Sequence, residues 1–335
     1  MKRMLLLLLF MCVGLGAQSQ AFTFVSSTTF SPAYNDGAFR GLSGIDYVPE
    51  RGWYVVSDRG GSRTRANEGN IFLADKLPPA ADAQLLTPTA APYSFESIRY
   101  DARRELVYLS AERDSVNAGE QDSTVVLALK SRDLGRPERA VRLLSQVSGS
   151  SNKGVEGLVI TPSGQLWVAP EAGWAGETAL NRPTVHFLRY KDPVAGNVPD
   201  SISYPIDRFP NAYYQNDKPG GIAELLAIDD STLLVLERAY HIFLGEDQVK
   251  REVVLARLYR AQLDAKTQSF TKTEVFNFND PAQFPDGIRN LEGMAWGPPS
   301  ADGKRRLYIV ADDNFEYRPE RMTTQKNQLI ILEAR

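Results

Sequence analysis

The sequence predicts an all-β fold, a single β-propeller built from four-stranded blades, and three observations support this prediction. One paired signal recurs five times: a short apolar strand opened by a hydroxyl or acidic residue, then a strand that ends at a carboxylate. The strand candidates are short, rich in Val, Leu, Ile and Tyr, and separated by Gly, Pro, Asp and Asn. No long stretch shows sustained helical periodicity. A degenerate repeat of this length is typical of propellers and solenoids.

The five copies share an opening position at the start of the first strand and a closing position at the end of the second. The opening residues are Ser43, Glu96, Glu156, Glu224 and Glu292. The closing carboxylates are Asp58, Glu112, Glu171, Glu237 and Asp312, with Asp313 next to the last. Because the copies are equivalent, we expect these groups at equivalent positions of the five blades.

Further strand candidates complete the blades. Two follow each of the first four pairs, at 70–75 and 83–87, 123–130 and 140–147, 184–190 and 201–207, and 253–263 and 273–278. After the fifth pair only 328–333 remains, so the alternating segment 22–30 is the expected donor of the missing strand. Pairing 22–30 with the C-terminal blade would close the ring and leave no open sheet edge. The count is five blades, and a sixth within the spacer 172–216 is an open alternative.

The N-terminal segment 1–21 predicts a secretory signal peptide. Lys2 and Arg3 precede an apolar run from Met4 to Leu15, and small and polar residues follow. That run is too short to span a bilayer, which takes about 20 residues. Cleavage after Ala17 or after Ala21 fits the pattern, and 22–335 is then one propeller domain. We expect the mature protein to be secreted or periplasmic, with no membrane attachment after cleavage.

Composition excludes several classes of chemistry. The one cysteine, Cys12, lies inside the predicted signal, so the mature chain has no thiol for disulfides, nucleophilic catalysis or zinc–thiolate sites. A lipoprotein would need a small residue before Cys12, where Met11 stands. The net charge is −3, with no basic footprint for nucleic acid. The two histidines, His186 and His241, argue against a multi-histidine metal centre.

Strand pairing predicts where the opening and closing residues lie. The first two strands of a blade are antiparallel neighbours, so the start of one lies beside the end of the other, at one face near the axis. Two carboxylates about 5 Å apart repel by roughly 3 kcal/mol at an effective dielectric near 20, so cations must lie among them or some must be protonated. The sequence supplies basic residues close to both sets. Three lie three residues before an opening position: Arg40, Lys153 and Arg289. Three directly follow a closing carboxylate: Arg59, Arg113 and Arg238.

Two interpretations of this charged face remain open. In the functional one, the closing carboxylates Asp58, Glu112, Glu171, Glu237 and Asp312 bind Ca²⁺, since oxygen ligands without histidine or cysteine suit a hard cation. Glu96, Glu156, Glu224 and Glu292 are then the catalytic candidates, which orient or deprotonate a water. Arg40, Arg59, Lys153, Arg238 and Arg289 bind the substrate. In the structural one, the carboxylates and cations neutralise one another and hold the blades together.

Eight short stretches, taken together, resemble one family. They are Gly41–Ile45, Ser57–Gly60, Phe95–Ile98, Asn152–Leu158, Gly221–Leu226, Leu236–Arg238, Asn290–Met294 and Asp312–Phe315. Over nearly the whole mature chain the sequence is similar to the phytase-like family, also described as esterase-like activity of phytase. The resemblance implies an exported β-propeller that hydrolyses phosphate or other esters. The Arg-His-Gly signature of histidine acid phosphatases is absent, which excludes their mechanism.

The leading hypothesis is therefore an exported hydrolase that acts on a small anionic phosphate or carboxylic ester at the central funnel, with calcium as the candidate metal and no organic cofactor. The alternative is a non-catalytic propeller that binds a ligand or protein through the same face and whose charges form a self-neutralised ring. Fold alone does not separate them, because propellers carry out both functions.

Overall fold

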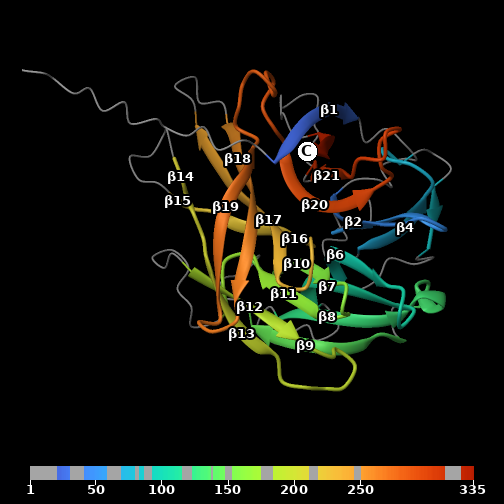
Figure 1. Ribbon diagram of the computed structural model, residues 1–335. Helices are drawn as coiled ribbons and strands as arrows, with labels where there is room; N and C mark the ends of the chain where they lie inside the picture. The colour runs from blue at the N-terminus through green and yellow to red at the C-terminus, as the bar shows by residue number, and fades with distance from the viewer. Residues whose placement is uncertain are drawn as a thin grey trace, which may run out of the picture.

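The structure is a computed structural model (Figure 1) that describes residues 21–30, 41–58, 69–79, 83–86, 93–114, 123–136, 139–147, 153–174, 184–210, 218–244, 250–313 and 326–335. Nearly all regular structure in these ranges is β-strand, beside the short 3₁₀ turn η3 (Ser131–Asp133). The all-β class that the sequence predicts is confirmed. No helix within these ranges has the length and apolar character needed to cross a membrane.

Three sheets hold four strands each, and each is antiparallel throughout. The first runs β2 (Leu42–Val48), β3 (Gly52–Ser57), β4 (Asn70–Ala74) and β5 (Gln84–Leu85). The second runs β6 (Tyr93–Asp101), β7 (Leu106–Asp114), β8 (Ser123–Lys130) and β9 (Val141–Val147). The third joins both ends of the chain, in the order β1 (Phe22–Phe30), β22 (Asn327–Ala334), β21 (Arg306–Asp312) and β20 (Asn290–Gly297).

The remaining large sheet has eight strands in two antiparallel halves. One half is β10 (Val155–Ile160), β11 (Leu166–Pro170), β12 (Thr184–Tyr190) and β13 (Asp200–Pro205). The other is β16 (Gly221–Ala227), β17 (Thr232–Leu244), β18 (Lys250–Asp264) and β19 (Ser269–Asn277). A single parallel contact, Ser203 opposite Ser269, joins β13 to β19. A small separate hairpin pairs β14 (Arg208–Phe209) with β15 (Lys218–Pro219).

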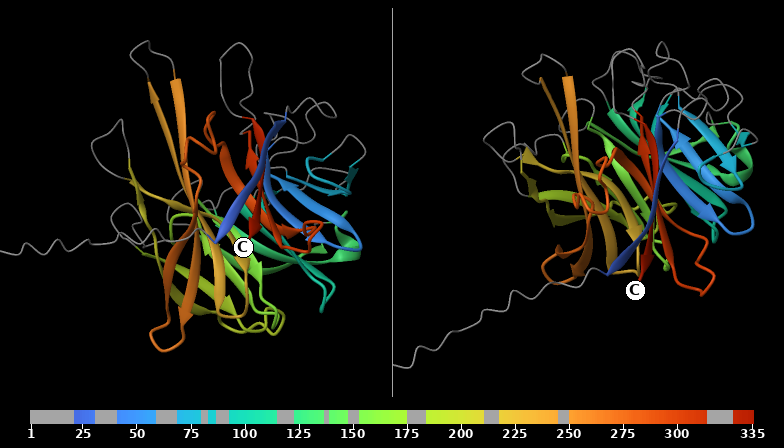
Figure 2. Two further views of the ribbon diagram at one scale, coloured as in Figure 1. Left: turned by 45° about the horizontal axis from the view of Figure 1, so that its top comes forward. Right: turned by 90° about the horizontal axis from the view of Figure 1, so that it is seen from above.

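The expected pairing of the two ends of the chain is present. β1 runs antiparallel to β22, with Phe22 opposite Ala334 and Phe30 opposite Asn327. Because β1 lies on the outer edge of this sheet, the first described strand of the chain completes the sheet formed by the last three. Figure 2 shows β1 beside the C-terminal strands in two further views.

The first strand of each four-stranded unit lies near the middle of the molecule. β2 contacts β6 and β20, β6 contacts β10, β10 contacts β16, and β16 contacts β20. Figure 1 shows these five strands close together, with the later strands of each unit farther out. We call them the inner strands. Their starts carry the opening positions, so these positions gather around one axis.

Hydrophobic clusters fill the spaces between neighbouring sheets. Trp53 and Val55 of the β2–β5 sheet pack with Val310 of the C-terminal sheet in one cluster, and Val56 packs with Phe95 of the β6–β9 sheet in another. Three further clusters join the remaining neighbours in the same way. Burial of such side chains contributes about 1.5–3 kcal/mol each, so sheet-on-sheet packing dominates stability.

One pair of strands is longer than the sequence predicts. The expected strand 253–263 extends to Lys250–Asp264, and its partner β17 continues to Leu244. Beyond Arg238 these two strands pair only with each other, Leu244 lying opposite Lys250. Figure 2 shows the extension reaching past the other sheets. The apolar run Val253–Leu255 indicated the part of the extension nearest the sheet, whereas the charged residues before it hid the start of the strand.

Candidate functional site

A β-bulge at the start of every inner strand determines which side chains face the axis. In four units the pairing skips the opening residue: Ser43, Glu96, Glu156 and Glu292. In the unit of β16 it skips Ala223 instead. A bulge leaves one residue unpaired and re-aims its side chain, so these five positions are equivalent. Glu224 therefore lies one residue further along, and the equivalence expected from the sequence is wrong for this unit.

The same shift affects the closing position of that unit. Asp312 lies opposite Asn290, and the backbone N–H groups of Asp58 and Glu171 donate to the carbonyls of Gly41 and Gly154. In the unit of β16 the residue opposite Gly221 is Arg238, not Glu237. Successive side chains of a strand point to opposite faces, so Glu237 points away from the closing positions of the other units. An arginine thus stands where the other units carry carboxylates.

These shifts build a cluster of charged side chains at the opening ends of the inner strands. We call it the rim cluster, and it comprises Lys153, Glu156, Glu171, Arg238, Asn290 and Glu292. Arg238 Nη1 donates to Glu292 Oε1 and to Asn290 Oδ1, and its Nη2 lies 3.7 Å from Glu171 Oε1. Lys153 Nζ donates to the same Glu171 oxygen at 2.9 Å. The cluster joins the starts of β10, β16 and β20.

Glu292 is the least satisfied carboxyl of the rim cluster. Its Oε1 accepts from Arg238 and, at 2.6 Å, from Asn290 Nδ2. Its Oε2 is buried and has no hydrogen-bond partner among the residues that the structure describes. Burial raises the pKa of Glu292, Arg238 opposes this rise, and the negative charge of Glu171 adds to it. One oxygen is therefore held in place while the other is left to accept a proton.

Arg238 is the central cation of the rim cluster. Burial alone would lower its pKa, but the charges of Glu292, Glu171 and Glu156 outweigh burial, and its pKa is raised. Its side chain is only 8% exposed. Three carboxylates thus share two cations, Arg238 and Lys153.

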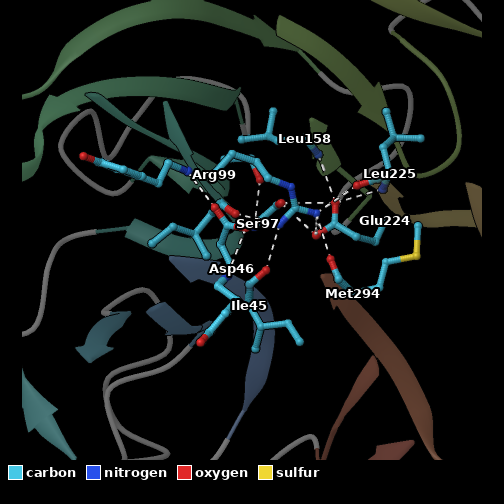
Figure 3. Close-up of polar contacts among 12 residues, drawn as sticks. Ile45, Asp46, Ser97, Arg99, Leu158, Glu224, Leu225 and Met294 are labelled. Atoms are coloured by element: carbon cyan, nitrogen blue, oxygen red, sulfur yellow. Dashed lines mark hydrogen bonds and ion pairs between the residues drawn. The ribbon is translucent and has the colours of Figure 1, made fainter. Parts of the chain in front are cut away.

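Deeper along the axis a second ion pair links all five inner strands, as Figure 3 shows. We call it the axial lock: the side chains of Arg99, Glu224 and Ser97. Arg99 Nη1 donates to the carbonyls of Ile45 and Ile98 at 2.8 and 2.7 Å. Its Nη2 donates to those of Leu225 and Met294 at 2.8 and 3.1 Å. The pairing registers make these four carbonyls equivalent positions of β2, β6, β16 and β20.

Glu224 completes the axial lock from the opposite side. Its Oε2 lies 2.7 Å from Arg99 Nη2 and accepts from Ser97 Oγ at 2.9 Å. Its Oε1 accepts from the backbone N–H groups of Leu158, at 3.1 Å, and Leu225, at 2.9 Å. Complete burial raises its pKa to about 7, against the lowering effects of Arg99 and these hydrogen bonds. Both oxygens of Glu224 are satisfied, unlike those of Glu292.

Glycines make room for the axial lock. Gly44, Gly157 and Gly293 occupy the position that Glu224 holds in its own unit. A Cβ at Gly44 or Gly293 would come within 3 Å of the backbone of a neighbouring inner strand. Four inner strands therefore carry Gly or Ser here, and the fifth supplies the one long side chain that the axis accommodates.

The other predicted site residues are placed as follows. Glu96 is buried and accepts from Ser94 Oγ at 3.2 Å. Glu237 accepts from Lys272, from Tyr204 OH at 2.7 Å and from the backbone N–H of Asp207 at 2.9 Å, and burial raises its pKa. Asp58 and Asp312 lie at closing positions of the axis, and the Arg289 backbone N–H donates to Gln328. Arg40, Arg59 and the side chain of Glu112 lie outside the described residues.

No group of three or more His, Cys, Asp or Glu residues in the described part of the chain is arranged to hold a metal ion. In the unit of β16 the closing position that was expected to supply a ligand holds Arg238, while Glu237 is bonded to Lys272. The set expected to bind calcium is thus divided between two regions, and the side chain of Glu112 is not described.

Sequence reasoning missed Arg99, Asn290 and Ser97. A signal for Arg99 was available, because Val159, Leu226 and Ala295 occupy its equivalent position in three other units, while Asp46 holds it in the unit of β2. A charged residue at a core position of one repeat indicates a buried partner. Asn290 gave no comparable signal, since an asparagine beside a strand start also suits a turn.

The fold and the two ion-pair networks define an all-β protein with a charged end on its axis. Residues 37–315 match the model of the phytase-like family, described as esterase-like activity of phytase. The chain belongs to this family, as its motifs predict. No curated protein matches the chain.

Solved structures with propeller-like sheets are similar in fold. The soluble aldose sugar dehydrogenase from Escherichia coli, in its apo-form, aligns with a TM-score of 0.50 at 10% identity, over 92% of this chain and 100% of the other. The exo-β-1,3-galactanase 1,3Gal43A from Clostridium thermocellum aligns with a TM-score of 0.51 at 9% identity, over 94% of this chain and 63% of the other. At such identities the likeness concerns the fold alone.

Proposed function

We propose that the protein is an ester hydrolase that works at the rim cluster, with Glu292 as the general base. The observation that carries this proposal is that the two carboxyl oxygens of Glu292 differ in their hydrogen bonds. Oε1 accepts from Arg238 and Asn290, while the buried Oε2 has no partner among the described residues. A carboxyl whose pKa is raised by burial is well suited to exchange protons. Membership of the phytase-like family supports the same reaction class.

In the proposed reaction, Glu292 takes a proton from water while the water oxygen bonds to the ester carbon or phosphorus. The ammonium of Lys153, which is 43% exposed, stabilises the negative charge that develops on the substrate oxygen. The bond to the alcohol oxygen then breaks, and Glu292 returns its proton to that oxygen. Arg238 keeps the Glu292 carboxyl oriented throughout. Glu156 and Glu171 hold the two cations in place.

The test is a panel of chromogenic carboxylic and phosphate esters, measured with the parent and with Glu292→Gln. Gln keeps the shape and the Oε1 contacts but removes the base, so kcat/KM should fall by about 10²–10⁴. Glu50→Gln, the same change in an exposed turn, is the matched control and should leave kcat/KM unchanged. Equal rates for Glu292→Gln and the parent would reject Glu292 as the base.

The alternative is a non-catalytic scaffold that binds a ligand or protein at this end. One observation favours it: both cations of the rim cluster already contact carboxylates. It predicts no hydrolysis of any ester in the panel by parent protein that is folded and monodisperse.

We also propose that the chain forms one closed propeller of five blades. Counting each half of the eight-stranded sheet as a blade supports this number, as do the circular contacts among the inner strands and the β1–β22 pairing. Deleting Phe22–Phe30 should expose the edge of β22 and cause aggregation. A truncated protein that stays monomeric, with the melting temperature of the parent, would contradict closure.

Calcium binding and export remain separate proposals from the sequence. Calcium held by the closing carboxylates should raise the melting temperature, by an amount that corresponds to about 2.7 kcal/mol at 100-fold excess over the dissociation constant. An unchanged melting temperature between millimolar calcium and EDTA would reject it. Export predicts that protein recovered from the periplasm or medium begins at residue 18 or 22.

A further inference from the structure

We infer that the site selects esters that carry no negative charge next to the scissile bond, and that it discriminates against phosphate monoesters. This inference rests on the proposed function, and it narrows the substrate class from anionic esters to uncharged ones. It departs from the anionic substrate that the sequence alone led us to expect.

The first observation is the charge balance at the opening ends of the inner strands. The described carboxylates at opening and closing positions are Glu96, Glu156, Glu292, Asp58, Glu171 and Asp312. The described cations in contact with these carboxylates are Lys153 and Arg238. The bulge in β16 places Ala223 at an opening position and Arg238 at a closing one, and even so carboxylates outnumber cations among these described residues.

The second observation is that Arg238, the buried cation of the rim cluster, is committed to carboxylates, which leaves Lys153 as the one described rim-cluster cation with substantial exposed surface. Arg238 is 8% exposed and contacts Glu292, Glu171 and Asn290. Recognition of a phosphate uses guanidinium or ammonium donors that are free to pair with its oxygens. A phosphate dianion could pair with Lys153, but a second cation would come only by breaking the contacts of Arg238, which would leave Glu292 and Glu171 as buried charges without that partner.

The third observation is the buried Oε2 of Glu292, which points to a ligand that donates a proton or a hydrogen bond. The pKa of Glu292 is already raised by burial and by the negative charge of Glu171. A dianion beside Glu292 would add a further negative charge and would be repelled whenever Glu292 is ionised. An uncharged ester meets no such opposition. Its hydrolysis needs only a base for water and one donor for the oxyanion, which Glu292 and the half-exposed Lys153 supply. Water and ester are consumed, and acid and alcohol are formed.

A matched series of substrates tests this inference. 4-Nitrophenyl butyrate and mono-(4-nitrophenyl) succinate share a leaving group and nearly the same acyl length, but the succinate ends in a carboxylate. We expect kcat/KM to favour the butyrate by roughly tenfold or more at low salt, with a narrower ratio in 0.5 M NaCl because screening weakens repulsion. 4-Nitrophenyl phosphate should be the poorest substrate.

Glu171→Gln provides the second arm. It removes one negative charge and releases donors of Lys153 and Arg238, so the preference for the butyrate should shrink or invert. Glu50→Gln is the control that should keep the parent ratio. The charge selection would be overturned if the parent hydrolysed the succinate or the phosphate as well as the butyrate, or better. If Glu292→Gln lost that activity, the proposed hydrolase would still stand. If Arg40→Ala or Arg59→Ala then abolished this turnover of the anionic substrates, the preference for them would be assigned to these two cations. No hydrolysis of any member would overturn the proposed function itself.

Discussion

The rim cluster and the axial lock each contain a buried arginine–glutamate pair, and the two glutamates differ in how their oxygens are bonded. Each pair joins two different four-stranded units. In the axial lock, four carbonyls surround the guanidinium and both oxygens of Glu224 are bonded. In the rim cluster, one oxygen of Glu292 is left without a partner among the described residues. The difference indicates that the lock stabilises the fold, while the rim keeps a group available for chemistry.

The largest effect is expected from Arg99→Met, which would break the axial lock. Removing one member of a buried ion pair leaves the other uncompensated and costs about 3–5 kcal/mol of unfolding free energy. Four backbone carbonyls would also lose their donor. Urea denaturation measures the change. The matched control is Arg132→Met, whose side chain is exposed, and its unfolding midpoint should match that of the parent. If Arg99→Met unfolded at the same urea concentration as the parent, the axial lock would not have the stabilising role assigned to it.

A pH titration of stability tests the axial lock without disturbing its shape. The pKa of Glu224 is raised from 4.5 to about 7, so the folded state holds a proton that the unfolded state releases between these values. The unfolding free energy should therefore fall as pH rises through this window, by up to about 3 kcal/mol, and level off above it.

Glu237 and Glu292 also have raised pKa values and act in the same direction. The contribution of Glu224 is thus the difference between the parent and Glu224→Gln, in which that part of the slope should be missing. Parallel curves for the two proteins would show that Glu224 does not titrate in this range.

A smaller effect sharpens the chemistry assigned to the rim. Asn290 Nδ2 donates to Glu292 and so favours its charged form. Asn290→Ala should raise the pKa of Glu292 further, and the acidic limb of the kcat/KM profile should move to higher pH by roughly one unit. Activity is lost as pH falls through that limb, because the base becomes protonated. A drop in kcat/KM with an unmoved limb would mean that Asn290 only supports the local fold.

Much of the fold could be predicted from the sequence, because strand alternation and turn residues are local signals. The segment 22–30 coincides with β1, and 123–130 and 184–190 coincide with β8 and β12. The segments between the predicted strands carry fewer such signals, and two of the predicted cations, Arg40 and Arg59, lie outside the described residues.

The register of one unit is where local reasoning failed. Aligning the copies by their acidic residues matched Glu224 with Glu156, whereas the bulge matches Glu156 with Ala223. The glycine two residues earlier, Gly154 in one copy and Gly221 in the other, would have given the correct alignment. Where a bulge falls depends on contacts between neighbouring inner strands, and a pattern of residue types within one strand does not contain those contacts.

The most direct test of the account is the crossed comparison of Glu224→Gln and Glu292→Gln, each measured for unfolding free energy and for kcat/KM per folded molecule. The account predicts that Glu224→Gln loses about 1–3 kcal/mol of stability and keeps its activity, since the amide nitrogen of Gln would place a donor against N–H donors that the Glu224 oxygens accept from. Glu292→Gln should lose activity by 100-fold or more and keep most of its stability. The reverse pattern, with catalysis lost at Glu224 and stability lost at Glu292, would contradict it.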